Sequence, residues 1–185
     1  MNTIYILGEP GVGKSTLVKE LTSTYKLVAN LQRPIPHTLY RTPTSERCIT
    51  LGAPHPTFPG TDTLPFNAIN QMERLFLQCT QHNLNIIGEG DRLANQRFIE
   101  LARNHGDLHL YYLVAPPAET AKRRQQRSQT HNTKQQDTAW VKGRQTKHSK
   151  LAAANNAITL DATKTPKELA AQIHADRQSH EAPHA

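Results

Sequence analysis

The sequence lacks long hydrophobic runs. Only 36% of its 185 residues are hydrophobic, and the apolar stretches extend over a few residues, whereas a helix that crosses a bilayer needs about 20. The first residues, MNTIYILGEP, enter a strand-like run without the basic start, apolar stretch and small-residue cleavage site of a signal peptide. We therefore expect a soluble, cytoplasmic protein with no membrane partner.

Cysteine is also scarce. Cys48 and Cys79 are too few for a disulfide framework and too far apart for a metal-binding pair, so reduced thiols are the simplest interpretation. No Ser-His-Asp arrangement and no Cys/His metal spacing stands out.

Acidic residues are scarce in one part of the chain. Between Lys122 and Lys150, nine lysines and arginines stand against a single acid, Asp137, so this segment carries a charge of +8. Because the whole chain carries +7, the remainder sums to −1. Concentrated positive charge attracts the phosphates of a nucleotide or of a nucleic-acid backbone. A solvated helix face is the structural alternative.

Strand-like and helix-like segments alternate along the chain. This alternation is typical of an α/β protein with a mostly parallel sheet flanked by helices. The length suits one domain, over residues 1–185. The patterns predict five strands, at 3–7, 46–52, 83–90, 108–115 and 157–162.

A proline-rich segment interrupts this pattern. Seven of the twelve prolines lie between Pro34 and Pro65, a density that excludes a long helix. We expect an ordered-loop insertion at about 30–66, with a helix following at 67–81. Within it, HPTFPGTDTLPF (55–66) presents Asp62 from a turn that Pro56 and Pro59 restrict. A rigid surface turn without a chemical role is the alternative.

The motif GEPGVGKS, residues 8–15, matches the phosphate-loop pattern G-x-x-x-x-G-K-[ST] in full, between a strand and a helix. Its glycines let backbone N–H groups surround phosphates, Lys14 reaches the β- and γ-phosphates, and the Ser15 hydroxyl binds Mg²⁺. The pattern resembles the P-loop nucleotide-binding family, which implies ATP or GTP with Mg²⁺. The nucleotide-binding residues would be Gly8, Gly11, Val12, Gly13, Lys14, Ser15 and Thr16.

Acidic residues end the strand at 83–90. If this strand continues through Asp91, Glu89 and Asp91 point to the same side at the carboxyl edge of the sheet, where α/β folds bind ligands. Glu89 could hold Mg²⁺, directly or through water. The acid followed by Arg92 is similar to a pair that nucleoside and thymidylate kinases use near the transferred phosphate. An Asp91–Arg92 helix cap and salt bridge is the alternative.

The basic segment at about 118–155 is expected to form a lid and a helix. Arg123 and Arg127 share one helical face, and the resemblance to small P-loop kinases implies that such arginines close over the phosphates. The basic run extends further than one ATP requires. We therefore predict that a second group contacts a phosphodiester backbone: Arg124, Arg144, Lys147 and Lys150.

Other P-loop classes fit less well. The sequence has no N-K-x-D motif, which specifies guanine, and no second glycine-rich motif of the kind found in transporter ATPases. It also has too few residues for an AAA module with its lid domain. A kinase with a P-loop, nucleotide-kinase-like fold and an arginine-bearing lid remains. In such kinases the acceptor-binding insertion follows the first helix, where residues 30–66 fall.

ITLGAPHPTFPGTDTL followed by GEGDRLANQRF is similar to a group of phage P-loop kinases that includes the 5-hydroxymethyluridine DNA kinases. The resemblance implies transfer of phosphate from ATP to the hydroxymethyl group of a modified pyrimidine in DNA, in the host cytoplasm if a phage encodes the protein. No protein partner is implied. The base would have to leave the stack to reach the γ-phosphate.

On this interpretation Asp62 is the first candidate to accept the proton of the acceptor hydroxyl, and Asp91 is the second. Lys14, Mg²⁺ and Arg123 or Arg127 would neutralise charge. Two alternatives stay open: a kinase of a free deoxynucleotide or nucleoside, and a nucleic-acid-binding ATPase that transfers phosphate only to water.

Overall fold

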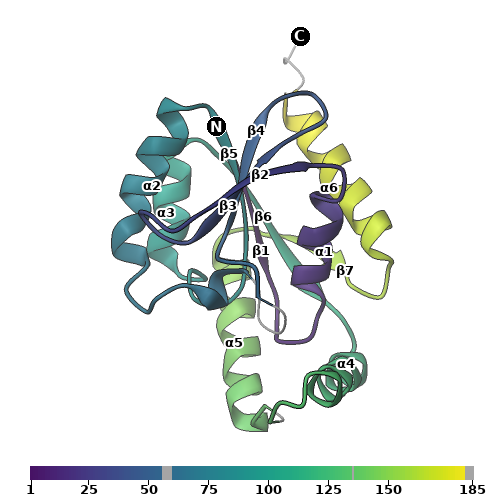
Figure 1. The fold of residues 1–185 in the computed structure, drawn as a ribbon. Coiled ribbons are helices and arrows are strands. Elements are labelled where there is room, and N and C mark those ends of the chain that lie inside the picture. Colours follow the sequence, from purple (N-terminus) through teal and green to yellow (C-terminus); the bar gives the residue numbers. More distant parts are fainter. Residues whose placement is uncertain (56–59, 135, 182–185) are drawn as a thin grey trace.

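A seven-stranded sheet forms the centre of the molecule (Figure 1). The computed structural model describes residues 1–55, 60–134 and 136–181, so Pro56 and Pro59 lie outside the described residues. The strand order is β2-β3-β4-β5-β1-β6-β7. The strands are β1 (Asn2–Leu7), β2 (Lys26–Leu31), β3 (His37–Arg41), β4 (Arg47–Leu51), β5 (Leu84–Glu89), β6 (Asp107–Val114) and β7 (Ile158–Asp161).

The mostly parallel sheet is confirmed, but the number of strands was wrong. The five expected strands form the parallel part, β4-β5-β1-β6-β7. The insertion adds β2 and β3, which pair antiparallel with each other, and β3 pairs antiparallel with β4. Strand β2 at the sheet edge is exposed along most of its length, so it lacks the alternation that marks a half-buried strand.

Helices cover both faces of the sheet (Figure 1). α1 (Lys14–Leu21) packs beside α6 (Pro166–Glu181), and α2 (Ile69–Gln81) packs beside α3 (Gln96–His105) on the opposite face. α4 (Pro117–Thr130) and α5 (Thr138–Ala154) lie beyond the carboxyl edge of the sheet. A short 3₁₀ helix, η1 (Gly60–Thr63), lies near the end of β5. Loops that follow parallel strands therefore meet under α4 and α5.

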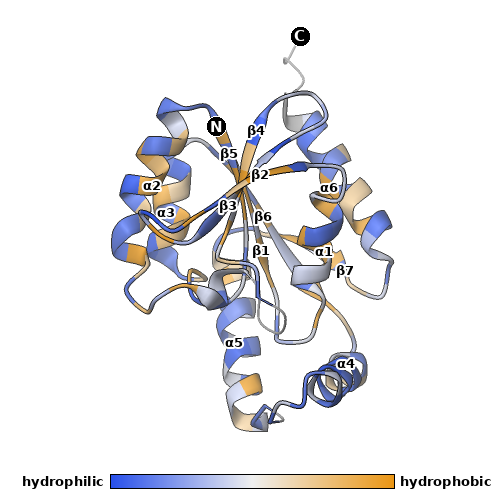
Figure 2. Ribbon diagram, in the orientation of Figure 1, coloured by the Kyte–Doolittle hydropathy of each residue, from blue (hydrophilic) through white to orange (hydrophobic). Residues whose placement is uncertain are grey.

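Alternation along the central strands divides the core into two layers. Tyr5 and Leu7 pack with α2 and α3, whereas Ile4 and Ile6 pack with α1 and α6. Figure 2 shows the hydrophobic central strands and the hydrophilic α4. No helix among the described residues is long and apolar enough to cross a membrane.

Both cysteines belong to this core. Cys48 and Cys79 are buried free thiols, and burial raises the pKa of each to about 12. Both side chains therefore stay protonated near neutral pH and act as small apolar groups.

Gly52 lies at a close contact between the end of β4 and η1 of the insertion. Gly52 follows β4 with φ of +93°, and a Cβ there would overlap the backbone carbonyl group of Gly60 in η1. We expect Gly52→Ala to lower the free energy of unfolding by about 2–4 kcal/mol.

Gly143, inside α5, has open space around it, so Gly143→Ala should raise the free energy of unfolding by roughly 0.5–1 kcal/mol. Urea titrations of both variants measure the two effects, and a Gly52→Ala protein as stable as wild type would contradict the expectation.

Candidate active site

The phosphate loop connects β1 to α1 and is built from backbone that only glycine adopts easily. Gly11 and Gly13 have φ of +84° and +110°. A Cβ on Gly11 would lie 2.8 Å from the carbonyl oxygen of Thr120, so the loop sits tightly against α4. No side chain caps α1 at Gly13, which leaves the helix N-terminus facing the cavity as an anion site.

Lys14 lies within this loop. Its Nζ donates to the carbonyl oxygens of Gly8 at 2.8 Å and Glu9 at 3.0 Å. Burial lowers the pKa of Lys14, while the nearby carboxylates of Glu89 and Asp62 oppose that change. The amine is thus held at the centre of the loop, where a phosphate would meet it.

Glu89 ends β5 directly beside the loop. The Ser15 hydroxyl donates to its Oε1 at 2.7 Å, and Glu89 is buried. Burial raises the pKa of Glu89 to about 7, and the positive charge of Lys14 and the Ser15 hydrogen bond only partly offset this. The hydroxyl and the carboxylate are the oxygen donors that Mg²⁺ prefers, usually together with substrate phosphates. Ser15 and Glu89 therefore fit the magnesium role expected of them.

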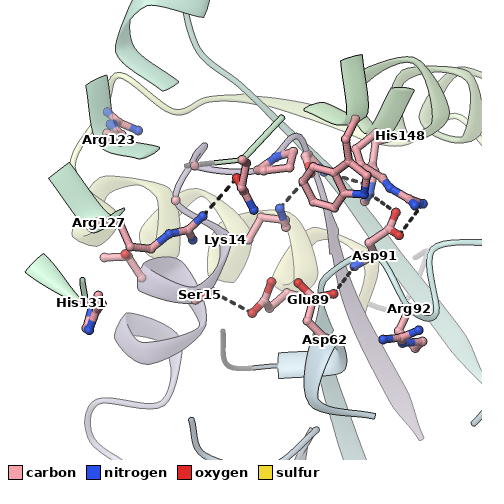
Figure 3. Close-up of a pocket in the computed structure, with 18 of the residues that line it drawn as sticks. Lys14, Ser15, Asp62, Glu89, Asp91, Arg92, Arg123, Arg127, His131 and His148 are labelled. Atoms are coloured by element: carbon pink, nitrogen blue, oxygen red, sulfur yellow. Dashed lines mark hydrogen bonds and ion pairs between the residues drawn. The ribbon is translucent and has the colours of Figure 1, made fainter. Parts of the chain in front are cut away.

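Asp62 reaches the same cavity from the insertion. Its Oδ1 accepts a hydrogen bond from the backbone N–H of Asp91 at 3.0 Å. Gly60 lies so close to Glu89 that a Cβ on Gly60 would overlap the Glu89 carboxylate. The insertion is therefore fastened to the end of β5, with Asp62 beside Glu89 (Figure 3).

Glu89 and Asp91 do not act as the paired acids that strand geometry predicts. β5 ends at Glu89, and Gly90 with φ of +117° turns the chain, so the two side chains have different partners. Asp91 contacts α5 instead: its carboxylate lies 2.7 Å from Arg144, 2.9 Å from Lys147 and 3.2 Å from His148. Burial alone would raise the pKa of Asp91, but these donors hold it well below its usual range.

Charged residues near the end of β5 have partners within the site. Arg144 and Lys147 both bind the Asp91 carboxylate, while about a third of each side chain stays exposed, so their contact with a nucleic-acid backbone stays a prediction. Arg92 lines the cavity, and its guanidinium lies 3.8 Å from the ring centroid of Phe66; the alternative, a salt bridge to Asp91, does not form among the described residues. Lys150 is exposed on α5 and stays a candidate for backbone contact.

The arginines of α4 divide into two kinds. Arg123 donates to the carbonyl oxygens of Val12 and Ala162, each at 3.1 Å, and Arg124 donates to Pro10 at 2.9 Å. Arg124, expected to bind nucleic acid, thus supports the phosphate loop from behind. Arg127 extends toward Lys14 in Figure 3, and both Arg123 and Arg127 line the cavity, where lid arginines were expected.

Most of these groups line one cavity of about 770 Å³, whereas Arg124 and Lys147 are not among its lining residues. Sequence reasoning missed several of its lining residues: Phe66, His131, Gln136 and His148. Trp140 also lines the cavity and is 41% exposed. The basic spacing on α5 was a signal for His148, because His148 lies four residues after Arg144 on the same helical face.

Comparison with known proteins identifies the fold. The family model described as P-loop Nucleotide Kinase3 matches residues 1–176. No curated protein matches the sequence.

Solved structures share the fold at low identity. A gluconokinase from Sinorhizobium meliloti has a TM-score of 0.53 at 10% identity, over 98% of both chains. A tunicamycin resistance protein from Deinococcus radiodurans has a TM-score of 0.54 at 17% identity, over 95% of both chains. A sugar kinase from a Janibacter species has a TM-score of 0.51 at 13% identity, over 99% of this chain and 96% of the other.

The raised pKa of Glu89 has a consequence for stability. Between pH 4.5 and pH 7 the folded protein holds the Glu89 proton more tightly than the unfolded chain. This contribution to stability is therefore complete below pH 4.5 and is lost as pH rises through 7. Relative to Glu89→Gln, wild type should lose roughly 2–3 kcal/mol of unfolding free energy between pH 5 and pH 8.

Urea titrations at both pH values, without nucleotide or divalent cation, measure this difference. Glu73→Gln, on the exposed side of α2, is the matched control and should follow the wild-type profile. If Glu89→Gln also runs parallel to wild type, the carboxyl group ionises in its buried position without cost.

Proposed function

The chain belongs to the P-loop nucleotide kinase 3 family and is a P-loop kinase, and we propose that it transfers the γ-phosphate of ATP to the hydroxymethyl group of 5-hydroxymethyluracil in DNA. The observation that carries this proposal is the cavity itself. It combines a phosphate loop, the Ser15–Glu89 pair and the carboxylate of Asp62, and aromatic side chains stand beside them.

The phosphate half of the cavity supplies binding and charge. Backbone N–H groups at the α1 terminus and Lys14 would hold the β- and γ-phosphates, and Arg127 would approach them from α4. Ser15 and Glu89 would hold a magnesium ion, which neutralises charge on the phosphates when bound. Arg123 and Arg124 would contribute before ATP binds, because their hydrogen bonds to the carbonyl oxygens of Val12 and Pro10 stabilise the conformation of the phosphate loop.

Asp62 is the better candidate to accept the proton of the acceptor hydroxyl. Asp91 is engaged by three donors from α5, and its lowered pKa makes it a weak base. The Asp62 carboxylate receives a single backbone N–H and faces the cavity beside Glu89. A general base needs an oxygen with free capacity within reach of the hydroxyl, which favours Asp62.

Aromatic residues support a planar acceptor such as a nucleobase. Phe66 is 90% exposed and Trp140 is 41% exposed, although both are large and apolar. Both line the cavity, and Arg92 and Arg144 lie over their rings at 3.8 and 5.3 Å. Exposed rings stack on bases of single-stranded or flipped-out nucleotides.

A free nucleoside or nucleotide is the second candidate acceptor. It is favoured by the pairing of Arg144 and Lys147 with Asp91, because the carboxylate offsets one of their two positive charges and so lowers the charge available to a DNA backbone. The lysines that stay exposed on α4, α5 and their connection are Lys122, Lys134, Lys142 and Lys150.

Transfer of label from [γ-³²P]ATP tests the acceptor. We expect label on DNA that contains 5-hydroxymethyluracil, and little on plain DNA or on a panel of mononucleotides and nucleosides. Lys14→Ala should abolish transfer, because the β/γ-phosphates lose their cation. Label on the free compounds alone would favour the second candidate, and free phosphate alone would indicate an ATPase.

Asp62→Asn tests the proton acceptor with the acceptor that the panel identifies. We expect kcat to fall about 100-fold or more, because the amide cannot take a proton, while the KM for ATP stays near wild type. Asp107→Asn is the control, because Asp107 is exposed at the amino end of β6, far along the strand from the cavity. An unchanged kcat in Asp62→Asn would remove Asp62 from the mechanism.

A further inference from the structure

His148 is a buried polar residue between two parts of the active site. It belongs to α5 and is 1% exposed. Its Nδ1 lies 3.1 Å from the backbone nitrogen of Gly8, and its Nε2 lies 3.2 Å from Oδ1 of Asp91. The ring therefore spans the distance between the start of the phosphate loop and the end of β5 (Figure 3).

The partners determine which ring nitrogen carries the proton. The Gly8 backbone N–H can only donate, so Nδ1 must accept and cannot hold a proton. Nε2 then carries the proton and donates it to the Asp91 carboxylate. A doubly protonated ring would direct an N–H at the N–H of Gly8, in a buried place that also lies near the positive charge of Lys14. The geometry thus requires the neutral ring.

His148 thus bridges Gly8 and Asp91, and each of these two residues contacts further groups of the cavity. The carbonyl oxygen of Gly8 accepts a hydrogen bond from Lys14, so the residue whose backbone N–H contacts His148 also positions the phosphate-binding amine through its carbonyl group. Asp91 binds Arg144 and donates its own backbone N–H to Asp62. A chain of contacts therefore runs from the phosphate loop to the acceptor side.

We propose that His148 is a positioning residue that, as the neutral Nε2-protonated ring, ties the phosphate loop to Asp91 and so fixes the loop conformation that binds ATP. Without an acceptor at Nδ1, the Gly8 N–H must turn to another partner, and the change in the backbone angles of Gly8 also moves its carbonyl oxygen, which holds Lys14. The competent loop then forms only part of the population, and apparent ATP affinity falls by that fraction. The proposal rests on ATP binding by the kinase and not on the identity of the acceptor.

Nuclear magnetic resonance tests the ring directly. Long-range ¹⁵N–¹H spectra of the wild-type protein at pH 7.5 should show His148 with Nδ1 unprotonated and Nε2 protonated. A spectrum with Nδ1 protonated would overturn the proposal, and this measurement needs no variant that folds differently.

Two substitutions separate the two ends of the bridge. Asn places a polar atom near the position of Nδ1, and Gln places one near Nε2. We expect His148→Asn, with its amide oxygen toward Gly8, to bind Mg·ATP within about twofold of wild type, and His148→Gln to bind about tenfold more weakly because Gly8 loses its acceptor. Calorimetric titration without any acceptor measures both, and His82→Asn and His82→Gln, exposed at the end of α2, are matched controls.

Equal ATP affinity in the two His148 variants would overturn the proposal. A histidine that only supports the fold would lower the unfolding temperature in both variants alike and leave the ATP affinity of the folded protein unchanged. Because no acceptor is present, a difference between the variants would stand even if 5-hydroxymethyluracil DNA is not the substrate.

Discussion

The active site depends on the parallel pairing of β1 with β5. Their register aligns Ile6 with Glu89, so the chain leaves both strands at the same edge, and the phosphate loop after β1 lies beside the acids after β5. Side chains of parallel strands in an α/β sheet are buried on both faces, so both core layers stabilise this register of β1 and β5. A shift by one residue would exchange the side chains of the two layers. The 2.7 Å contact between Ser15 and Glu89 follows from this register.

The positive charge of the second half is used largely inside the molecule. Arg123 and Arg124 bind carbonyl oxygens of the phosphate loop, and Arg144 and Lys147 bind Asp91. Each of these contacts joins α4 or α5 to a loop at the carboxyl edge of the sheet. These basic residues thus hold two largely hydrophilic helices, α4 and α5, over the cavity. The basic residues that stay exposed could still contact a phosphate-bearing partner.

Sequence reasoning worked where the signal is local. The phosphate loop is a contiguous motif, and the five parallel strands are short apolar runs, so both could be predicted. β2 was missed because an edge strand that is exposed on both sides leaves no alternation. The partners of Asp91 were missed because the pairs with Arg144 and Lys147 join residues more than 50 positions apart, and a count of charges does not say which charges meet.

Environment gives two neighbouring acids opposite properties. Glu89 is buried and has one hydroxyl partner, so burial outweighs the nearby charge of Lys14 and raises the pKa of its carboxyl group to about 7. Asp91, two residues later, is met by donors from α5, and the pKa of its carboxyl group falls. Acids whose pKa values are driven apart in this way serve different roles. Glu89 would give up its proton if it holds Mg²⁺, whereas Asp91 binds donors of α5 and anchors that helix. Asp62, which the insertion supplies, is the acid that we propose to act on the acceptor.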